Sequence, residues 1–386
     1  MSVTAPQGFR AAGIAAGIKA GGRPDLALVV NDGPRHAAAG VFTRNKVKAA
    51  PVLWSEQVLV TGRLRAVVLN SGGANACTGP EGFQTAHATA EKAADVLGCG
   101  AAEVAVCSTG LIGAQLPRDV VLAGVGSAAG ALVATADAGL AAATAVMTTD
   151  TVAKQATRTD PAGWSVGGLA KGAGMIAPSM ATLLVVLTTD AAVDAPVLDE
   201  ALRAAVRVSF DRLDIDGSMS TNDTVLAMAS GASGVTADPV DLTAALTAVC
   251  RDLTQQLQAD AEGVTKRITV RVSGAATEDD AVTVARAVAR DSLVKTALFG
   301  SDPNWGRIAA AVGCSAADVV PERLDVTING VTLCRGGLAA GNRAAADLSG
   351  KEITVAVELG LGDGTAEILT TDLSPAYVEE NSAYSS

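Results

Sequence analysis

The stretch KGAGMIAPSMATLLVVLTTD, Lys171 to Asp190, joins a tract of small residues to an apolar run. The run from Thr182 to Thr188 is rich in Leu and Val, and it has the length and composition of a buried strand. Thr182 stands at its start as a lone hydroxyl. A buried strand of this kind is typical of a layered protein in which helices cover a sheet.

The segments around this stretch predict more strands and helices. Ala66 to Asn70 and Glu103 to Thr109 have the composition of buried strands, and residues 82–97 between them have that of a helix. This alternation is typical of a βαβ unit. The Ala-rich stretch Ser127 to Met147 predicts one buried helix, because alanine has a high helix propensity. Further predictions are helices at Ala195–Ser209 and Val240–Ala259 and a half-exposed strand at Lys266–Val272.

The C-terminal part is predicted to consist of strands from Arg323 onward. One hairpin is expected around Asn329-Gly330, the strongest short hairpin signal, and another around Gly362-Asp363-Gly364. We therefore expect an α/β (α+β) protein, a layered sandwich of sheets and helices. Its strand-rich C-terminal subdomain is expected to span about residues 275 to 386.

Charge and hydropathy limit the partners of the chain. The 386 residues include 29 Lys and Arg and 40 Asp and Glu, a formal net charge of −11, and the acidic residues are scattered. This charge disfavours nucleic acid and anionic lipid as partners. No apolar run approaches the ~20 residues of a membrane span, and the N-terminus does not resemble a secretory signal. We expect a cytoplasmic protein that acts on small molecules.

Metal ligands are scarce. The six cysteines form no C-x-x-C pair and lie mostly in apolar surroundings, so we expect buried free thiols. Only His36 and His87 are present, and a multi-histidine metal site is therefore not expected. The same scarcity limits the available catalytic bases.

Thr182 has a candidate base in its own α-amine. A threonine hydroxyl needs an adjacent base to become a nucleophile, and an N-terminal threonine supplies one. The α-amine has a reference pKa of about 7.7 to 8.0, whereas lysine at about 10.4 would need strong depression. An internal threonine acquires this amine only if the Ala181–Thr182 bond is cut. The alternative interpretation is that Thr182 simply begins a strand after a turn.

KGAGMIAPSMATLL resembles the processing site of the ornithine acetyltransferase family, also called the glutamate N-acetyltransferase family. Members of that family cleave themselves before a threonine. The resemblance covers nearly the whole chain. Further similar segments are FTRNKVKAAPV (42–52), NSGGANACTG (70–79), CSTGLIG (107–113), MTTDT (147–151), DGSMSTNDT (216–224), EGVTK (262–266) and SLVKTALFGSDPNWGRI (292–308).

The resemblance implies roles for individual residues. Cleavage would fall between Ala181 and Thr182, Thr182 would carry the acetyl group, and its new α-amine would be the base. Thr109 and Gly110 match the pair that stabilises the oxyanion, and a hydroxyl with a backbone N–H after a strand suits that task. The substrate contacts implied by the resemblance are Thr148, Lys171, Thr182, Glu262, Asn381 and Ser386.

The resemblance also implies the reaction and the assembly. The acetyl group would pass from N2-acetylornithine to glutamate, with no metal or cofactor, and some members of the family also use acetyl-CoA as a co-substrate. Fragments 1–181 and 182–386 would assemble as a heterotetramer with two copies of each. Two alternatives stay open: a hydrolase with an N-terminal threonine, and a protein that binds amino acids without turnover.

Overall fold

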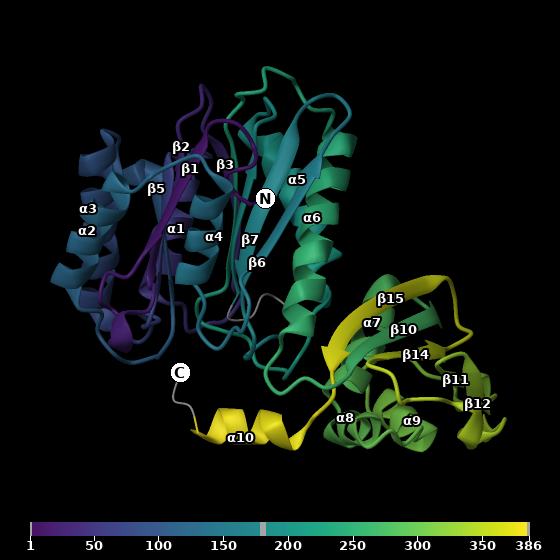
Figure 1. Cartoon of the computed structure of the whole chain (residues 1–386). Helices are drawn as coiled ribbons and strands as arrows, with labels where there is room; N and C mark the ends of the chain where they lie inside the picture. Colours follow the sequence, from purple (N-terminus) through teal and green to yellow (C-terminus); the bar gives the residue numbers. More distant parts are fainter. Residues whose placement is uncertain (1, 178–182, 384–386) are drawn as a thin grey trace. The chain divides into compact units, whose positions relative to one another are not determined.

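The computed structural model describes residues 2–177 and 183–383, which form two compact units (Figure 1). The N-terminal unit comprises Met1–Asp211 and Ser218–Asp260. The C-terminal unit comprises Arg212–Gly217 and Ala261–Ser385. No helix among the described residues is long and apolar enough to cross a membrane.

Two sheets form the frame of the N-terminal unit. The first has the strand order β1-β2-β4-β5, with bounds Phe9–Ile14, Leu26–Asn31, Ala66–Ser71 and Val104–Thr109. The second has the order β3-β9-β8-β7-β6, with bounds Ala37–Phe42, Thr224–Ala229, Leu184–Thr189, Ser165–Lys171 and Lys154–Thr159. β4 and β5 are parallel and are joined by α2, which confirms the predicted βαβ unit.

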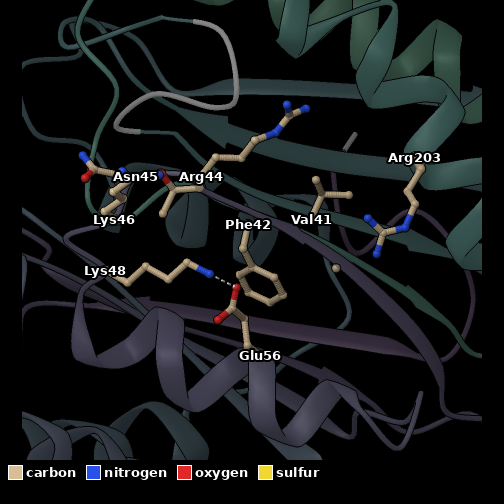
Figure 2. Close-up of a pocket in the computed structure, with 10 residues that line it drawn as sticks. Val41, Phe42, Arg44, Asn45, Lys46, Lys48, Glu56 and Arg203 are labelled. Atoms are coloured by element: carbon tan, nitrogen blue, oxygen red, sulfur yellow. Dashed lines mark hydrogen bonds and ion pairs between the residues drawn. The ribbon is translucent and has the colours of Figure 1, made fainter.

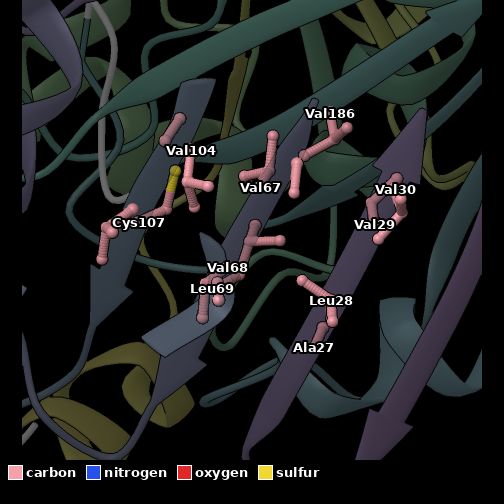
Figure 3. Packing of buried hydrophobic residues seen from close by; sticks show 14 of the residues in the cluster. Ala27, Leu28, Val29, Val30, Val67, Val68, Leu69, Val104, Cys107 and Val186 are labelled. Atoms are coloured by element: carbon pink, nitrogen blue, oxygen red, sulfur yellow. The ribbon is translucent and has the colours of Figure 1, made fainter. Parts of the chain in front are cut away.

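Helices cover both sheets. α2 and α3 pack against the first sheet, α5 and α6 cover the second, and α1 and α4 each contact both sheets (Figure 1). Their bounds are α1 Ala50–Leu59, α2 Gly79–Leu97, α3 Arg118–Gly130, α4 Ala136–Ala145, α5 Ala195–Arg207 and α6 Pro239–Ala259. One apolar core joins the two sheets, and Leu28 of β2, Val67 of β4 and Val186 of β8 are fully buried in it (Figure 3). The layered fold class is thus confirmed.

The single helix predicted over Ser127–Met147 is wrong, because α3 ends at Gly130 and α4 begins only at Ala136. Between them, Val133 exchanges two backbone hydrogen bonds with Ala11 of β1, at 3.1 and 3.2 Å. The hydroxyl of Thr135 then caps α4 by accepting from the N–H of Ala138. The backbone groups of this segment are therefore satisfied by a strand and a cap and not by a continuous helix.

The C-terminal unit contains one sheet with the order β13-β12-β11-β14-β10-β15. The strand bounds are β10 Arg267–Ala275, β11 Asp325–Ile328, β12 Val331–Arg335, β13 Leu338–Ala339, β14 Glu352–Glu358 and β15 Gly364–Thr371. The helices are α7 Glu278–Arg290, α8 Ser292–Phe299, α9 Trp305–Gly313 and α10 Pro375–Ala383. Short 3₁₀ helices of the two units lie at Ala20–Gly22, Ala101–Glu103, Phe210–Arg212, Pro321–Arg323 and Arg343–Ala345.

One of the two predicted hairpins is confirmed. β11 and β12 join at Asn329-Gly330, where both residues have positive φ, 45° and 81°, as a type I′ turn requires. The second hairpin is wrong, because β14 and β15 are separated by β10, which pairs with β14 in parallel and with β15 antiparallel. The prediction of strands alone after Arg323 is also wrong, since α10 follows β15.

The expectation of buried thiols is confirmed for only part of the set. Cys107, Cys250 and Cys334 are buried, whereas Cys77 and Cys314 are exposed. All six cysteines are free.

Candidate functional site

Three strand ends meet at one edge of the five-stranded sheet. Lys171, the last residue of β7, lies opposite Leu184, the first residue of β8. Leu184 in turn lies beside Thr224, the first residue of the parallel strand β9. The predicted strand at Thr182–Thr188 is thus confirmed from Leu184 onward, and Leu183, the residue after Thr182 in the sequence, is placed at this edge.

The ammonium group of Lys171 contacts two other predicted site residues, Thr148 and Thr109. Its Nζ donates to Thr148 Oγ1 at 2.8 Å and to Thr109 Oγ1 at 3.3 Å, and the side chain is 1% exposed. Thr109 ends β5, and Thr148 follows α4. An ammonium group only donates, so each threonine oxygen accepts from it and keeps its own hydrogen for another acceptor.

The predicted Gly110 directly follows Thr109 in a conformation that favours glycine. Its φ is 132°, and a Cβ added there would lie 2.6 Å from the backbone nitrogen of Gly73. The N–H of Gly73 donates to the carbonyl of Thr109 at 3.0 Å, which fixes this crossing of the two loops. The position therefore excludes side chains and brings the backbone close to the site.

Asp150, which the sequence analysis did not single out, carries the negative charge of this cluster. Its carboxylate accepts from Lys154 Nζ and from the N–H of Gly172, both at 2.7 Å, and lies 3.9 Å from Lys171 Nζ. Burial alone would raise the pKa of Asp150, but the charges of Lys171 and Lys154 and these hydrogen bonds outweigh it and lower the pKa to about 2. The segment MTTDT contained the residue, but no spacing pattern identified it.

Asp223 is a second carboxyl that the sequence analysis missed. Its Oδ1 accepts from the N–H of Leu183 at 2.9 Å, and the side chain is fully buried. Its Oδ2 has no hydrogen-bond partner among the described residues. Burial raises the pKa of Asp223 well above its usual range, and the charge of Lys171 and a hydrogen bond from the backbone of Ser220 oppose this only in part.

The neighbouring Asn222 ties β9 to the loops of the first sheet. Its Nδ2 donates to the carbonyl of Ala74 at 2.6 Å and to that of Ser108 at 2.8 Å. The start of β9 is thereby joined to the end of β5, where Thr109 lies. Asn222 belongs to the segment DGSMSTNDT, for which the sequence suggested no individual role.

Lys19 is a further cation of this unit that no motif indicated. Its Nζ donates to the carbonyl of Met147 at 2.5 Å. Burial, aided by the positive charges of Arg23 and Lys171, lowers the pKa of Lys19 to about 8 against the opposing charges of Asp25 and Asp150. No motif in the sequence predicted this lowered pKa of Lys19.

The remaining predicted residues are Glu262, Asn381, Ala181, Thr182 and Ser386. Glu262 and Asn381 belong to the C-terminal unit, where Asn381 Nδ2 donates to Glu262 Oε2 at 2.9 Å. Asn381 lies in α10. Ala181, Thr182 and Ser386 lie outside the described residues.

Comparisons with known proteins agree over nearly the whole chain. The model of the ArgJ family matches residues 10–386. The arginine biosynthesis bifunctional protein ArgJ of Mycolicibacterium paratuberculosis is 64% identical over 389 residues, covering 100% of this chain and 96% of the relative. The protein of the same name from Streptomyces coelicolor is 61% identical over 386 residues, covering 100% of both.

A solved structure is similar to part of the chain. It is that of ornithine acetyltransferase from Mycobacterium tuberculosis complexed with ornithine. It is 63% identical and has a TM-score of 0.46. The match covers 47% of this chain and 96% of the solved chain.

Proposed function

Since the chain belongs to the ArgJ family of arginine-biosynthesis enzymes, we propose that it moves an acetyl group from N2-acetylornithine to glutamate through an acetyl-threonine at Thr182. Thr182 attacks the acetamide carbonyl, ornithine leaves, and the amine of glutamate then takes the acetyl group. This two-step exchange is a ping-pong reaction.

The observation that carries the proposal is the hydrogen bond from Lys171 to Thr109. Because Thr109 Oγ1 accepts from an ammonium group, its own O–H is free to donate to an oxygen that becomes negative. Gly110 follows in a backbone conformation open to close approach, and its N–H would be the second donor. A hydroxyl and a backbone N–H held this way form an oxyanion hole of the kind that acyl transfer needs.

The α-amine of Thr182 is the proposed general base, and the chain produces it by cleaving its own Ala181–Thr182 bond. The position of Leu183 supports this assignment, because its N–H is held by the buried carboxyl of Asp223 at the edge of the sheet where Lys171 also ends its strand. Cleavage yields fragments 1–181 and 182–386. These assemble as a heterotetramer of two copies of each in the cytoplasm.

Polar side chains are proposed to bind the substrates. They are those of Thr148, Lys171, Thr182, Glu262, Asn381 and Ser386. A cation suits the carboxylate of an amino acid, and an acid such as Glu262 suits its amine. The reaction needs no metal or cofactor, and acetyl-CoA serves as a second acetyl donor to glutamate.

The test is to purify the wild type and Thr182→Ala and to compare their chain composition and activity. The wild type should run as two fragments on a denaturing gel and form N-acetylglutamate from N2-acetylornithine and glutamate. Thr182→Ala should stay intact and inactive. A wild type that is fully active as one intact chain would refute the amine-base mechanism. Acetate release that glutamate does not change would indicate a hydrolase.

A further inference from the structure

A hollow of about 530 Å³ lies at the end of the edge strand β3, in the N-terminal unit (Figure 2). Four cations line it, Arg44, Lys46, Lys48 and Arg203, together with one carboxylate, Glu56. The chain as a whole carries a net charge of −11, whereas the residues that line this hollow have an excess of positive charge. A pocket of this size is in the range of small-molecule sites.

Within residues 2–177 and 183–383, two of these cations form ion pairs with neighbouring carboxylates. Lys48 Nζ lies 2.5 Å from Glu56 Oε1, and a dashed line in Figure 2 marks this ion pair. Arg203 Nε lies 2.8 Å from Asp199 on α5. Arg44 and Lys46 are exposed and form no ion pair among the described residues. The hollow therefore offers one guanidinium and one ammonium group to an anion, and an arginine fork and a lysine point charge are the usual ligands of phosphate.

The strand register places this hollow at the same sheet edge as the candidate site. Phe42, which ends β3 and lines the hollow, lies opposite Thr224 of β9, and Thr224 lies beside Leu184 of β8. Two strand spacings of ~4.8 Å separate β3 from β8, so the backbone of Phe42, in the wall of the hollow, lies roughly 10 Å from Leu184 at the start of β8. An acyl donor bound by its phosphates in the hollow must bridge about this distance.

We propose that the hollow binds the phosphate groups of acetyl-coenzyme A, and that the thioester of the bound coenzyme reaches Thr182, the proposed acetyl acceptor. This inference rests on the proposed function. The pantetheine arm of coenzyme A is about as long as four residues of extended chain, on the order of 14 Å, which suffices for the distance. N2-acetylornithine and glutamate carry carboxylates, to which the proposed function assigns Lys171, and neither carries a phosphate. The cations of the hollow are therefore assigned to the phosphates of the coenzyme donor. In the transfer, the thioester carbonyl bonds to the threonine oxygen, the carbon–sulfur bond breaks, and the threonine proton leaves with the thiolate as free thiol.

The first experiment measures both acetyl donors with the double variant Arg44→Ala/Lys46→Ala. Loss of two charge-assisted hydrogen bonds should lower kcat/KM for acetyl-CoA roughly tenfold or more relative to kcat/KM for N2-acetylornithine. The matched control is Arg118→Ala/Arg335→Ala, which removes two exposed cations elsewhere. An unchanged ratio of the two constants in the pocket variant, or an equal fall in the control, would overturn the proposal.

The second experiment measures binding of free coenzyme A and of inorganic pyrophosphate to the wild type by calorimetry. Both should bind, more weakly as salt rises, and Arg44→Ala/Lys46→Ala should weaken both. If coenzyme A does not bind to the wild type, the proposal is overturned. It is also overturned if the variant changes its oligomeric state but binds coenzyme A with the affinity of the wild type. If coenzyme A binds in the hollow but N2-acetylornithine is not turned over, the proposed function fails while the pocket assignment stands.

Discussion

The hydroxyl of Thr109 is held by an ammonium group, and this determines what the hydroxyl can do. An oxygen that accepts from Lys171 leaves its hydrogen for another acceptor, whereas a carboxylate at the same place would capture that hydrogen. The chemistry at this position therefore depends on the sign of the neighbouring charge.

Thr109→Val tests the hydroxyl with little change of shape. We expect kcat for acetyl transfer to fall by roughly 10²–10³, because one donor of the oxyanion hole is lost. Thr109→Ser keeps the hydroxyl and should retain most of the activity. Steady-state rates on chains of confirmed processing provide the measurement, and a Val variant as active as the Ser variant would exclude a role for this hydroxyl.

Asp150 gives the N-terminal unit an acid-sensitive contribution to stability. Its pKa of about 2 is below the reference value near 4 of an unfolded chain, so the carboxylate stabilises the folded state above that value. This contribution, about 2 kcal/mol, is lost as the pH falls from about 4 through about 2. Urea unfolding from pH 6 to pH 2 should show this loss in the wild type.

Asp150→Asn should lack this pH-dependent term. At pH 7 it should also lower the free energy of unfolding by about 3 kcal/mol or more, because the ammonium groups of Lys154 and Lys171 stay buried beside a neutral amide. A variant with the stability and acid sensitivity of the wild type would contradict the assigned pKa.

At the scale of the elements, contacts between segments far apart in the sequence determined the helix boundaries and strand pairings that local sequence patterns did not predict. Composition correctly located β4, α2, β5, α5 and α6. The two strands are continuous apolar runs, and the three helices are long or clearly periodic. Composition predicted α3 and α4 as one helix, because the alanines around Val133 do not indicate that this residue pairs with β1. Composition likewise predicted that β14 and β15 form a hairpin, because the residues of these two strands do not indicate that β10 lies between them.

The packing of α4 on β1 can be tested at Gly13. A Cβ added there would lie 2.0 Å from the carbonyl oxygen of Ala141 in α4, and a backbone atom cannot move aside cheaply. Gly13→Ala should therefore lower the free energy of unfolding by about 3 kcal/mol. Gly130→Ala, where nothing lies within 4 Å, should be neutral or slightly stabilising. Equal thermal shifts for the two variants would contradict this packing.

At the scale of the whole molecule, the sequence predicted the fold class and a cluster of site residues but not how they are held. Thr109, Thr148 and Lys171 were assigned by the resemblance to the ornithine acetyltransferase family, and the structure brings them together. Asp150 and Asp223 were missed, because a buried carboxyl is recognised by its surroundings and not by its neighbours in sequence. The C-terminal unit also includes Arg212–Gly217, which is separate in sequence from the rest of the unit. The composition around this segment does not resemble a linker, so the sequence did not predict this boundary.

The strand order of the five-stranded sheet has a consequence for any chain cut before Thr182. β3, β7 and β6 would belong to one fragment and β8 and β9 to the other, yet β9 lies beside β3 and β8 beside β7. Two backbone ladders then join the fragments, which should migrate together until the sheet melts. Refolding after such a cut requires an encounter between two molecules, so its rate should rise with protein concentration. The intact Thr182→Ala chain should lack that dependence, and dilution series of both proteins after denaturation would show whether they differ.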